Sequence, residues 1–403
     1  MSRAEQFADN AIVEHVFGHA HFNEGNSQHQ VESCGKAEVS RIEAHAAQLD
    51  RDPLTPIMFC GSRWGTSVVQ HLSPSHRSLD AKLISNDHRP SGLFLLTSQL
   101  WRWGIPIPLN KSAETHLTFD GTPLLDRTQG AAAFASLLRS RHALAPLLLK
   151  MISADGPFLG AVRTACHATG ARFEITQSYE RASLVCEISF TEWFEAAFSR
   201  KRRKEYRRLR TRLSERGNLQ TISFQSGDNL TSWIDDFLKL ERSSWKGARG
   251  TAMSQNTDQE RALRQALSTL AQRNELFFWR LDLSGEPVSM LFAMSRGNRA
   301  WLGKIAHDGR YEQYSPGALI ILDATESFLS SPHIKIVDSC ARPNHPLIDN
   351  IWRDRLAFAD ILIAPPGMPS TLFSALVWAE KNRLRARQTL KSLWLFINGR
   401  SES

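Results

Sequence analysis

Short apolar runs alternate with amphipathic segments along most of the chain, and the pattern is clearest in its second half. Runs of about five to eight residues, rich in β-branched and aromatic side chains, are typical of strands. Longer segments with apolar residues three or four positions apart are typical of helices. The strands expected here are residues 219–224, 276–282, 287–294, 299–305, 334–338 and 356–363. The helices expected between them are residues 230–242, 259–274 and 317–329.

The first half shows the same alternation of apolar runs and amphipathic segments after a polar N-terminal stretch. Its expected strands are residues 57–60, 79–85, 92–96, 158–162 and 182–188, and residues 130–151 are Ala- and Leu-rich and are expected to be helical, with an interruption at Pro146. One helix is expected near 38–49 and another over 372–397. Alternating strands and helices predict an α/β (α+β) fold with mixed sheets flanked by helices.

Length and these changes of texture predict four segments. A chain of 403 residues has room for two or three domains of about 150 residues. Residues 1–52 are expected to be a polar, flexible N-terminal segment. Residues 53–195 and 196–367 are expected to be two α/β domains, the second beginning with a basic helix, and residues 368–403 a basic C-terminal helix.

The positive charge is concentrated in one place. The net charge is +8, and nine Lys and Arg residues lie between Arg200 and Arg212 with Glu205 as the only acid. A solvated helix face that bridges the two domains is the preferred interpretation. Binding of a coenzyme's phosphates, of an anionic substrate, of anionic lipid or of nucleic acid is the functional alternative. No zinc finger, RNP aromatic pair or helix-turn-helix flanks the segment, so nucleic acid is not expected as a partner.

Other sequence features narrow the class of protein. The five cysteines are odd in number, scattered and without a C-x-x-C pair, which argues against a disulfide framework and a zinc site. No metal is expected. The N-terminus lacks the apolar core of a signal peptide, and no run approaches the roughly 18 apolar residues of a membrane span. A cytoplasmic protein is therefore expected.

One short motif is suited to anion binding. Ser315 is a good N-cap, Pro316 fits the first helical position, and Gly317 lets a ligand approach the backbone. Such a helix start could receive a pyrophosphate. By spacing alone, an ordinary well-capped helix is the better interpretation.

A resemblance gives the motif more weight. The second half resembles the CelD-type (cellulose-biosynthesis, BioF-like) acetyltransferase domain of the GNAT superfamily over roughly residues 195–363. The residues that carry the resemblance are 237–241, 244–247, 250–252, 285–288, 314–317 and 338–341. It implies tandem GNAT-like domains related to the FemABX transferases, and Thr122–Asp126 is similar to a stretch in the first half of such proteins. The usual GNAT phosphate loop, R/Q-x-x-G-x-G/A, is matched only in part here.

The resemblance also implies roles for particular residues. The phosphates of acyl-CoA would be held at Gln313, Ser315, Pro316, Gly317 and Ala318. The catalytic candidates are Asp338 as base or substrate anchor, with Glu241 and His307 as alternatives, and Tyr314 or Tyr311 as acid. The substrate-binding candidates are Trp245, Lys246, Gly247 and Arg342. For Asp338, a carboxylate that only caps a turn is as good an interpretation as a catalytic one. For Tyr314, a packing role is preferred to a catalytic one. For Cys340, a buried structural thiol is preferred to a nucleophile.

The function expected from these observations is acyl transfer in polysaccharide biosynthesis. An acyl group, acetyl in the first instance, would move from acyl-CoA to an amine or hydroxyl of a sugar, glycolipid or polysaccharide precursor. Two alternatives stay open: a FemABX-like transferase that uses aminoacyl-tRNA, and a non-catalytic protein that binds nucleic acid or a membrane surface. Peripheral contact of the basic segments with an anionic membrane is a further expected interaction.

Overall fold

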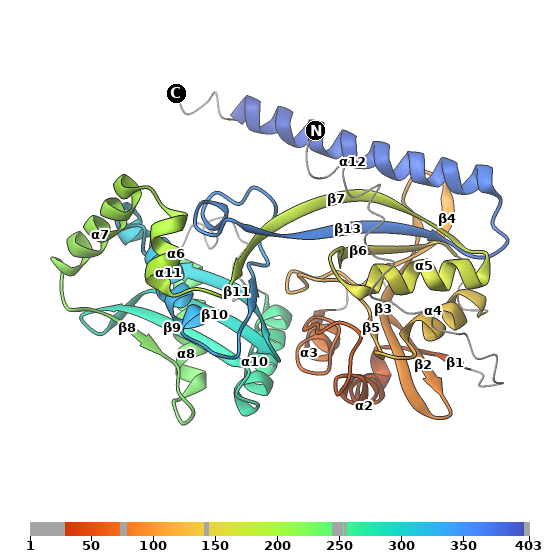
Figure 1. The fold of residues 1–403 in the computed structure, drawn as a ribbon, viewed down its shortest axis with the longest axis horizontal. Helices are drawn as coiled ribbons and strands as arrows, with labels where there is room; N and C mark the ends of the chain where they lie inside the picture. Colours follow the sequence, from red (N-terminus) through yellow and green to blue (C-terminus); the bar gives the residue numbers. More distant parts are fainter. Residues whose placement is uncertain (1–28, 73–78, 141–144, 244–252, 254–255, 399–403) are drawn as a thin grey trace.

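A continuous mixed sheet runs through the whole molecule (Figure 1). The computed structural model describes residues 29–72, 79–140, 145–243, 253 and 256–398. The strand order is β1-β2-β3-β4-β6-β13-β7-β12-β11-β10-β9-β8, and the short β5 pairs with β3 outside this path. Helices flank the sheet in both halves, which confirms the predicted fold class.

The two halves repeat one order of elements: a strand, two helices, a three-stranded meander, a helix and a strand parallel to the last meander strand. In the first half these elements are β1 (Gln30–Cys34), α2 (Val39–Leu49), α3 (Gly65–Leu72), β2 (Leu79–Asn86), β3 (Arg89–Trp101), β4 (Pro106–Ser112), β5 (Leu124–Leu125), α4 (Gly130–Arg139) and β6 (Leu147–Ser153), followed by α5 (Pro157–Thr169) and β7 (Arg172–Val185). In the second half they are β8 (Leu219–Ser223), α8 (Leu230–Ser243), α10 (Thr257–Gln272), β9 (Leu276–Leu283), β10 (Glu286–Arg296), β11 (Arg299–His307), α11 (Pro316–Leu329) and β12 (Ile336–Asp338). This internal repeat is a tandem arrangement.

Two long strands join the halves. β13 (Asp354–Ala364) pairs antiparallel with β7 over eleven residues, from Asp354 opposite Ser183 to Ala364 opposite Arg172. β13 also pairs with β6 of the first half, while β7 pairs with β12 of the second half. Each half thus contributes a strand to the sheet of the other. β13 is a nearly continuous apolar run, as expected for a strand covered on both faces.

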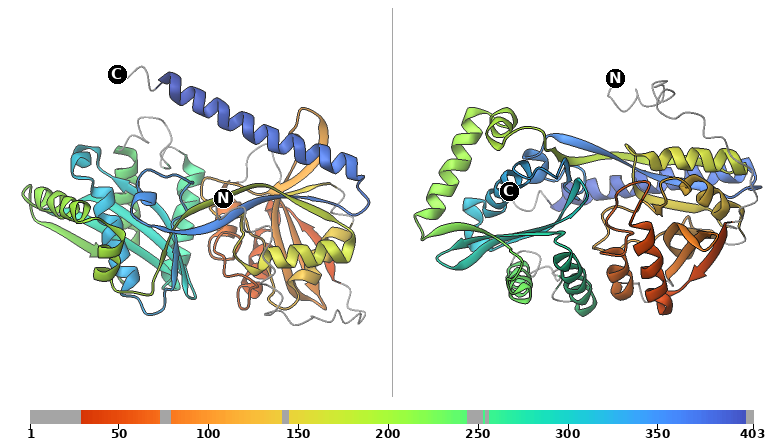
Figure 2. Two further views of the ribbon diagram at one scale, coloured as in Figure 1. Left: turned by 45° about the horizontal axis from the view of Figure 1, so that its top comes forward. Right: turned by 60° about the horizontal axis from the view of Figure 1, so that its bottom comes forward.

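Helices cover both faces of each half. In the first half, α4 and α5 pack on one face around Phe134 and Phe158, and α12 (Ser370–Asn398) packs on the other through Phe373 and Leu376. In the second half, α8 and α10 cover one face and α11 the other. The helices α6 (Phe190–Ala197) and α7 (Arg200–Ser214) extend from the α11 side, as Figure 2 shows.

Four expectations for the first half need correction. Residues 30–49 form β1 and α2, with Ile42, Ala46 and Leu49 buried, so this part of the N-terminal segment is ordered. Residues 57–60 are a buried loop before α3 instead of a strand. Residues 147–153 form strand β6 where a helix is expected, and residues 158–162 lie in helix α5 where a strand is expected. The last two differences have one reason, which is that a short apolar run in a core does not distinguish a central strand from a buried helix.

Candidate functional site

The parallel strands β11 and β12 are paired over only three residues. Arg299, Ala300 and Trp301 lie opposite Ile336, Val337 and Asp338, and β12 ends there. β11 continues to His307 and is paired with β10 on its other side. The edge of β11 over 302–307 therefore extends beyond the end of β12. An extended ligand can run beside such an edge and use its backbone groups.

A β-bulge interrupts β11 in the middle of this edge. Leu291 lies opposite Ile305 and Ala293 opposite Leu302, so Gly303 and Lys304 both face Phe292. A Cβ atom on Gly303 would lie 2.0 Å from a ring atom of Phe292, so only glycine fits. Beside the bulge, the Lys304 ammonium lies 3.9 Å from a carboxylate oxygen of Glu241, which is on α8 and has a side-chain exposure of 1%.

Helix α11 begins beside the far end of β11. The space that a Cβ of Gly317 would occupy is 3.4 Å from Ile305, 3.6 Å from the Nδ1 of His307 and 3.6 Å from Leu347. Ser315 has a φ of 49°, and its side chain makes no capping hydrogen bond, so the expected N-cap role is not realised. Pro316 brings no N–H, and the Ala318 and Leu319 N–H groups donate to the Ser315 carbonyl at 2.9 and 3.2 Å instead of to a side-chain cap. The first turn of α11, at the positive end of the helix dipole, contains no acidic residue.

Basic side chains surround this helix start. η5, the 3-10 helix Gly309–Tyr314, leads into α11 and packs against the basic helix α7. The Arg216 Nε donates to the Tyr314 hydroxyl at 3.0 Å. Arg310 is 81% exposed and pairs with Asp308, and its hydrogen bond lowers the pKa of that carboxyl. Gln313 is exposed, whereas Pro316, Gly317 and Ala318 are buried.

Asp338 lies in a buried ion pair at the end of β12. Its carboxylate accepts a hydrogen bond from the guanidinium of Arg181 on β7 and another from the Cys340 backbone N–H at 2.9 Å. The side-chain exposures of Asp338 and Arg181 are 1% and 4%. Arg181 also donates to the Phe119 carbonyl at 2.5 Å and stacks on the Phe358 ring at 3.6 Å. These contacts tie the loop after β12 to the strand that joins the two halves.

The remaining candidates lie around these groups. Glu241 is fully buried and accepts from the Met253 backbone N–H at 2.9 Å. Arg342 is exposed in the loop that follows β12. Cys340 is buried, and burial raises the pKa of its thiol. Trp245, Lys246 and Gly247 lie outside the described residues.

The candidates fall into two groups along β11. Asp338 is in register with Trp301, and His307 beside the α11 start is six residues further on. At about 3.3 Å per strand residue, the two positions are roughly 20 Å apart. Asp338 belongs to the first position and Tyr314 through Ala318 to the second, while Lys304, with Glu241 beside it, lies midway between them. Tyr314 is therefore distant from Asp338.

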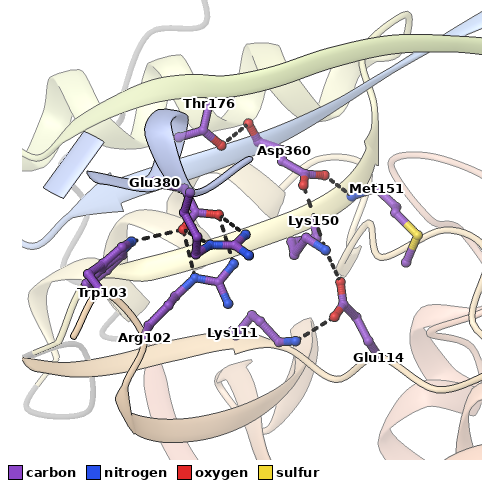
Figure 3. A network of polar contacts seen from close by, with 10 residues as sticks. Arg102, Trp103, Lys111, Glu114, Lys150, Met151, Thr176, Asp360 and Glu380 are labelled. Atoms are coloured by element: carbon purple, nitrogen blue, oxygen red, sulfur yellow. Dashed lines mark hydrogen bonds and ion pairs between the residues drawn. The ribbon is translucent and has the colours of Figure 1, made fainter. Parts of the chain in front are cut away.

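The first half has an equivalent place, and charged side chains fill it. β4 and β6 pair in parallel over only two residues, Asn110–Leu147 and Lys111–Leu148. Beside this pair, Glu114 bonds Lys111 at 2.5 Å and Lys150 at 2.6 Å, and Lys150 lies 3.9 Å from Asp360 of β13, as Figure 3 shows. The neighbouring lysines lower the pKa of Glu114 although burial opposes them.

The helix start in the first half is also different. Asp126 lies just before α4, and its carboxylate accepts from the backbone N–H groups of Thr128 at 2.9 Å and Gln129 at 2.8 Å. A protein carboxylate thus occupies the position that an anionic ligand would need. The stretch Thr122–Asp126, singled out by its resemblance, ends in this capping residue.

Two residues at the site were not found by sequence reasoning. Arg181 is one charged residue among several in a polar stretch, and nothing in the sequence marks it as buried. Lys304 follows a glycine inside an apolar strand, and a glycine in a strand interior is a known signal for a bulge. Among the described residues, no group of three or more His, Cys, Asp and Glu side chains is arranged to hold a metal ion.

Comparisons with known proteins agree with this description. Residues 200–338 match the model of the acetyltransferase (GNAT) domain family, and this range contains β11, α11 and Asp338. The matched residues all lie in the second half of the chain. A search of curated proteins gave no significant match.

Several solved structures are similar over both halves. The crystal structure of FemX matches with a TM-score of 0.51 and 9% identity, covering 84% of this chain and 98% of FemX, and shows a shared fold. A tandem GNAT protein from the clavulanic acid biosynthesis pathway has a TM-score of 0.41 and 15% identity, with 85% and 100% of the chains covered. The C-terminal domain of a putative lysylphosphatidylglycerol synthetase from Agrobacterium fabrum has a TM-score of 0.45 and 11% identity, with 81% and 92% covered.

Proposed function

We propose that this protein transfers an acyl group, acetyl in the first instance, from acyl-CoA to an amine or hydroxyl of a sugar, glycolipid or polysaccharide precursor, as its resemblance to CelD-type acetyltransferases implies. One observation carries the proposal. The edge of β11 that extends beyond the end of β12 leads to a helix start whose N-cap residue makes no side-chain capping hydrogen bond, and both lie within the segment that matches the GNAT family.

The phosphate end of the donor belongs at the start of α11. The backbone N–H of Gly317, together with Gln313 and Ser315, would bind the pyrophosphate, while Pro316 fixes the helix start without a donor. Ala318, whose N–H donates to the Ser315 carbonyl at 2.9 Å, would line the site. Arg216 and Arg310 add positive charge beside it. This is the chemistry that anion recognition requires.

The reacting end belongs near the bulge. An acyl-CoA bound in this way has an extended pantetheine arm that follows β11 back toward Gly303 and Lys304. The Glu241 carboxylate lies 3.9 Å from the Lys304 ammonium beside the bulge, and we assign it the role of base. It takes a proton as the acceptor nitrogen or oxygen bonds to the thioester carbonyl carbon. The C–S bond then breaks, and the coenzyme thiolate leaves and is protonated.

Other candidates take supporting roles in this proposal. Asp338 positions the loop that carries Arg342, because Arg181 and the Cys340 N–H already use its carboxylate. Tyr314 positions Arg216 at the phosphate end and is not the acid. Trp245, Lys246 and Gly247, which follow Glu241 in sequence, and Arg342 stay the proposed contacts to the acceptor.

The second half is the better donor site for a physical reason. In the first half, the network of Lys111, Glu114, Lys150 and Asp360 fills the corresponding position, and Asp126 places a negative charge at the helix start. A pyrophosphate there would meet a carboxylate at close range, which is unfavourable. In this proposal the first half has a structural role and does not bind the acyl donor.

Calorimetric titration of the full chain with acetyl-CoA tests the proposal. The double variant R216A/R310A removes two exposed charges beside α11, and R261A is the matched control on α10, where Arg261 is 64% exposed. Loss of a charge-assisted hydrogen bond is worth ~1.5 kcal/mol or more, so the double variant should bind at least about tenfold more weakly. Unchanged affinity, or an equal loss in R261A, would contradict the assignment.

An aminoacyl-tRNA donor is a second candidate, favoured by one observation. Within the described part of the chain, seven cations of α7 have no carboxylate within ion-pair distance. Two of them make other contacts, because Arg202 stacks on Tyr206 and Arg203 bonds backbone carbonyls, and the other five are Arg200, Lys201, Lys204, Arg207 and Arg212. This surface lies next to η5. Replacing these five residues by serine should weaken tRNA binding steeply if tRNA is the donor and leave acetyl-CoA affinity unchanged if it is not.

A further inference from the structure

Helix α12 is held firmly on the first half by one buried carboxylate. Glu380 is fully buried and accepts hydrogen bonds from Arg102 at 2.8 and 2.9 Å, from the Trp103 indole at 2.9 Å and from Arg383 at 2.7 and 3.0 Å, as Figure 3 shows. Arg102 and Trp103 belong to the turn between β3 and β4. The helix and this hairpin are therefore fixed relative to each other.

Exposed hydrophobic side chains gather on these two elements. Nine large hydrophobic residues are exposed among the described residues, and six of them belong to the β3–β4 hairpin or to α12: Leu100, Trp101, Ile105, Leu372, Trp378 and Leu390. Trp378 is 70% exposed and Trp101 is 61% exposed. The hairpin rises beside α12 on one side of the molecule (Figures 1 and 2). A concentration of exposed apolar side chains on two neighbouring elements is typical of an interaction surface.

The charge on α12 is positive. Glu380 is its only acidic residue, and that carboxylate is already used. Within the described residues, no carboxylate lies within ion-pair distance of Arg385 or Arg387. A groove of about 300 Å³ runs between α12 and β7 and is lined by Lys381, Arg385, Thr176 and Gln177 among others. Anionic head groups have both room and counter-charges along this helix.

We propose that α12 and the β3–β4 hairpin, here called the docking surface, bind the protein to the surface of an anionic lipid membrane. Exposed tryptophans beside Arg and Lys are the combination that suits a membrane–water interface. The positive charge selects lipid with anionic head groups over an apolar protein partner. No helix among the described residues is long and apolar enough to cross a bilayer, so the contact is peripheral. The inference does not depend on the proposed acyl transfer.

Flotation of the full chain with lipid vesicles tests the docking surface. Vesicles of phosphatidylcholine are compared with vesicles containing about one third phosphatidylglycerol. The wild type should float with the anionic vesicles, and added salt should release it. Flotation with neither kind of vesicle would overturn the proposal.

Two variants with matched controls locate the contact. W101S/W378S removes the exposed indoles, and R385S/R387S removes two charges, for which about 30-fold weaker binding is expected. The controls I222S, on β8, and R261S, on α10, make the same kinds of change in the second half and should bind vesicles as the wild type does. The two variants and the two controls should all keep wild-type affinity for acetyl-CoA. A failure of the membrane proposal can therefore be distinguished from a failure of the proposed function.

Two outcomes would overturn the location of the contact. Equal vesicle binding by the wild type and W101S/W378S would show that the indoles do not touch lipid. A concentration-dependent dimer in light scattering that W101S/W378S abolishes would show that a second copy of the chain covers this surface instead.

Discussion

Replacing Asp338 by asparagine separates a positioning role from a catalytic one. The variant D338N keeps the size of the side chain and the acceptor that receives the Cys340 N–H at 2.9 Å. It removes the negative charge that pairs with Arg181, a guanidinium whose side chain is only 4% exposed. The change therefore tests the buried ion pair with little disturbance of the turn.

The expected loss of stability in D338N depends on the interactions that Arg181 retains. Breaking a buried ion pair from one side costs ~3–5 kcal/mol, because the remaining charge stays buried. Arg181 retains the bond to the Phe119 carbonyl, the stacking on Phe358 and the nearby Asp120 charge. We therefore expect the lower end of the range, about 3 kcal/mol, and a melting temperature lower by about 3–4 °C for a chain of 403 residues.

Calorimetry of unfolding measures the loss, with acetyl-CoA titration of the folded protein beside it. Asp258 is 62% exposed in its pair with Arg261, so the control D258N should change the melting temperature by little more than 1 °C. D338N should bind acetyl-CoA within about threefold of the wild type, a difference under 1 kcal/mol. Unchanged stability together with complete loss of acyl transfer would refute the positioning role and make Asp338 the base.

Three further predictions concern single side chains. Because a Cβ on Gly303 would lie 2.0 Å from Phe292, G303A should lower unfolding free energy by ~1–3 kcal/mol in denaturant titration, whereas G160A, with nothing within 4 Å, should not. Hydrogen bonds from Arg383 and Arg102 hold the pKa of Glu380 at about 2, below the ordinary 4.5. The Glu380 carboxylate therefore stabilises the fold above pH 4.5, and this contribution is lost as the pH falls toward 2. In E380Q the free energy of unfolding should accordingly depend less steeply on pH between 4.5 and 2. Loss of the α4 cap in D126A should cost ~1 kcal/mol in thermal unfolding and leave acetyl-CoA affinity unchanged.

The helices and strands of the second half agree closely with those predicted from its sequence, because their ends are marked by local sequence signals. The predicted strands at 276–282 and 287–294 correspond to β9 (Leu276–Leu283) and β10 (Glu286–Arg296), joined by a turn at the expected place. The predicted helix at 317–329 is α11 within one residue. Turn residues, caps and long apolar periods are local signals, so a single sequence reveals them.

The pairing of distant segments could not be predicted in this way. The exchange of β7 and β13 between the halves depends on contacts across about 180 residues. The pairing of Asp338 with Arg181 could not be predicted either, because nothing in the sequence around either residue indicates its partner. The Ser-Pro-Gly start of α11 was identified correctly, but the left-handed backbone of Ser315 and the missing cap are set by how η5 meets the helix.

Hydrogen–deuterium exchange of the full chain, with and without saturating acetyl-CoA, tests the central claim most directly. The claim is that the acyl donor lies along the edge of β11 beyond the end of β12 and at the start of α11 in the second half. Bound acetyl-CoA should slow exchange in Arg299–His307 and in the first turns of Pro316–Leu329. Exchange in the equivalent Pro106–Ser112 and Gly130–Arg139 should stay unchanged. Protection of the first-half segments instead, or of neither pair, would contradict the account.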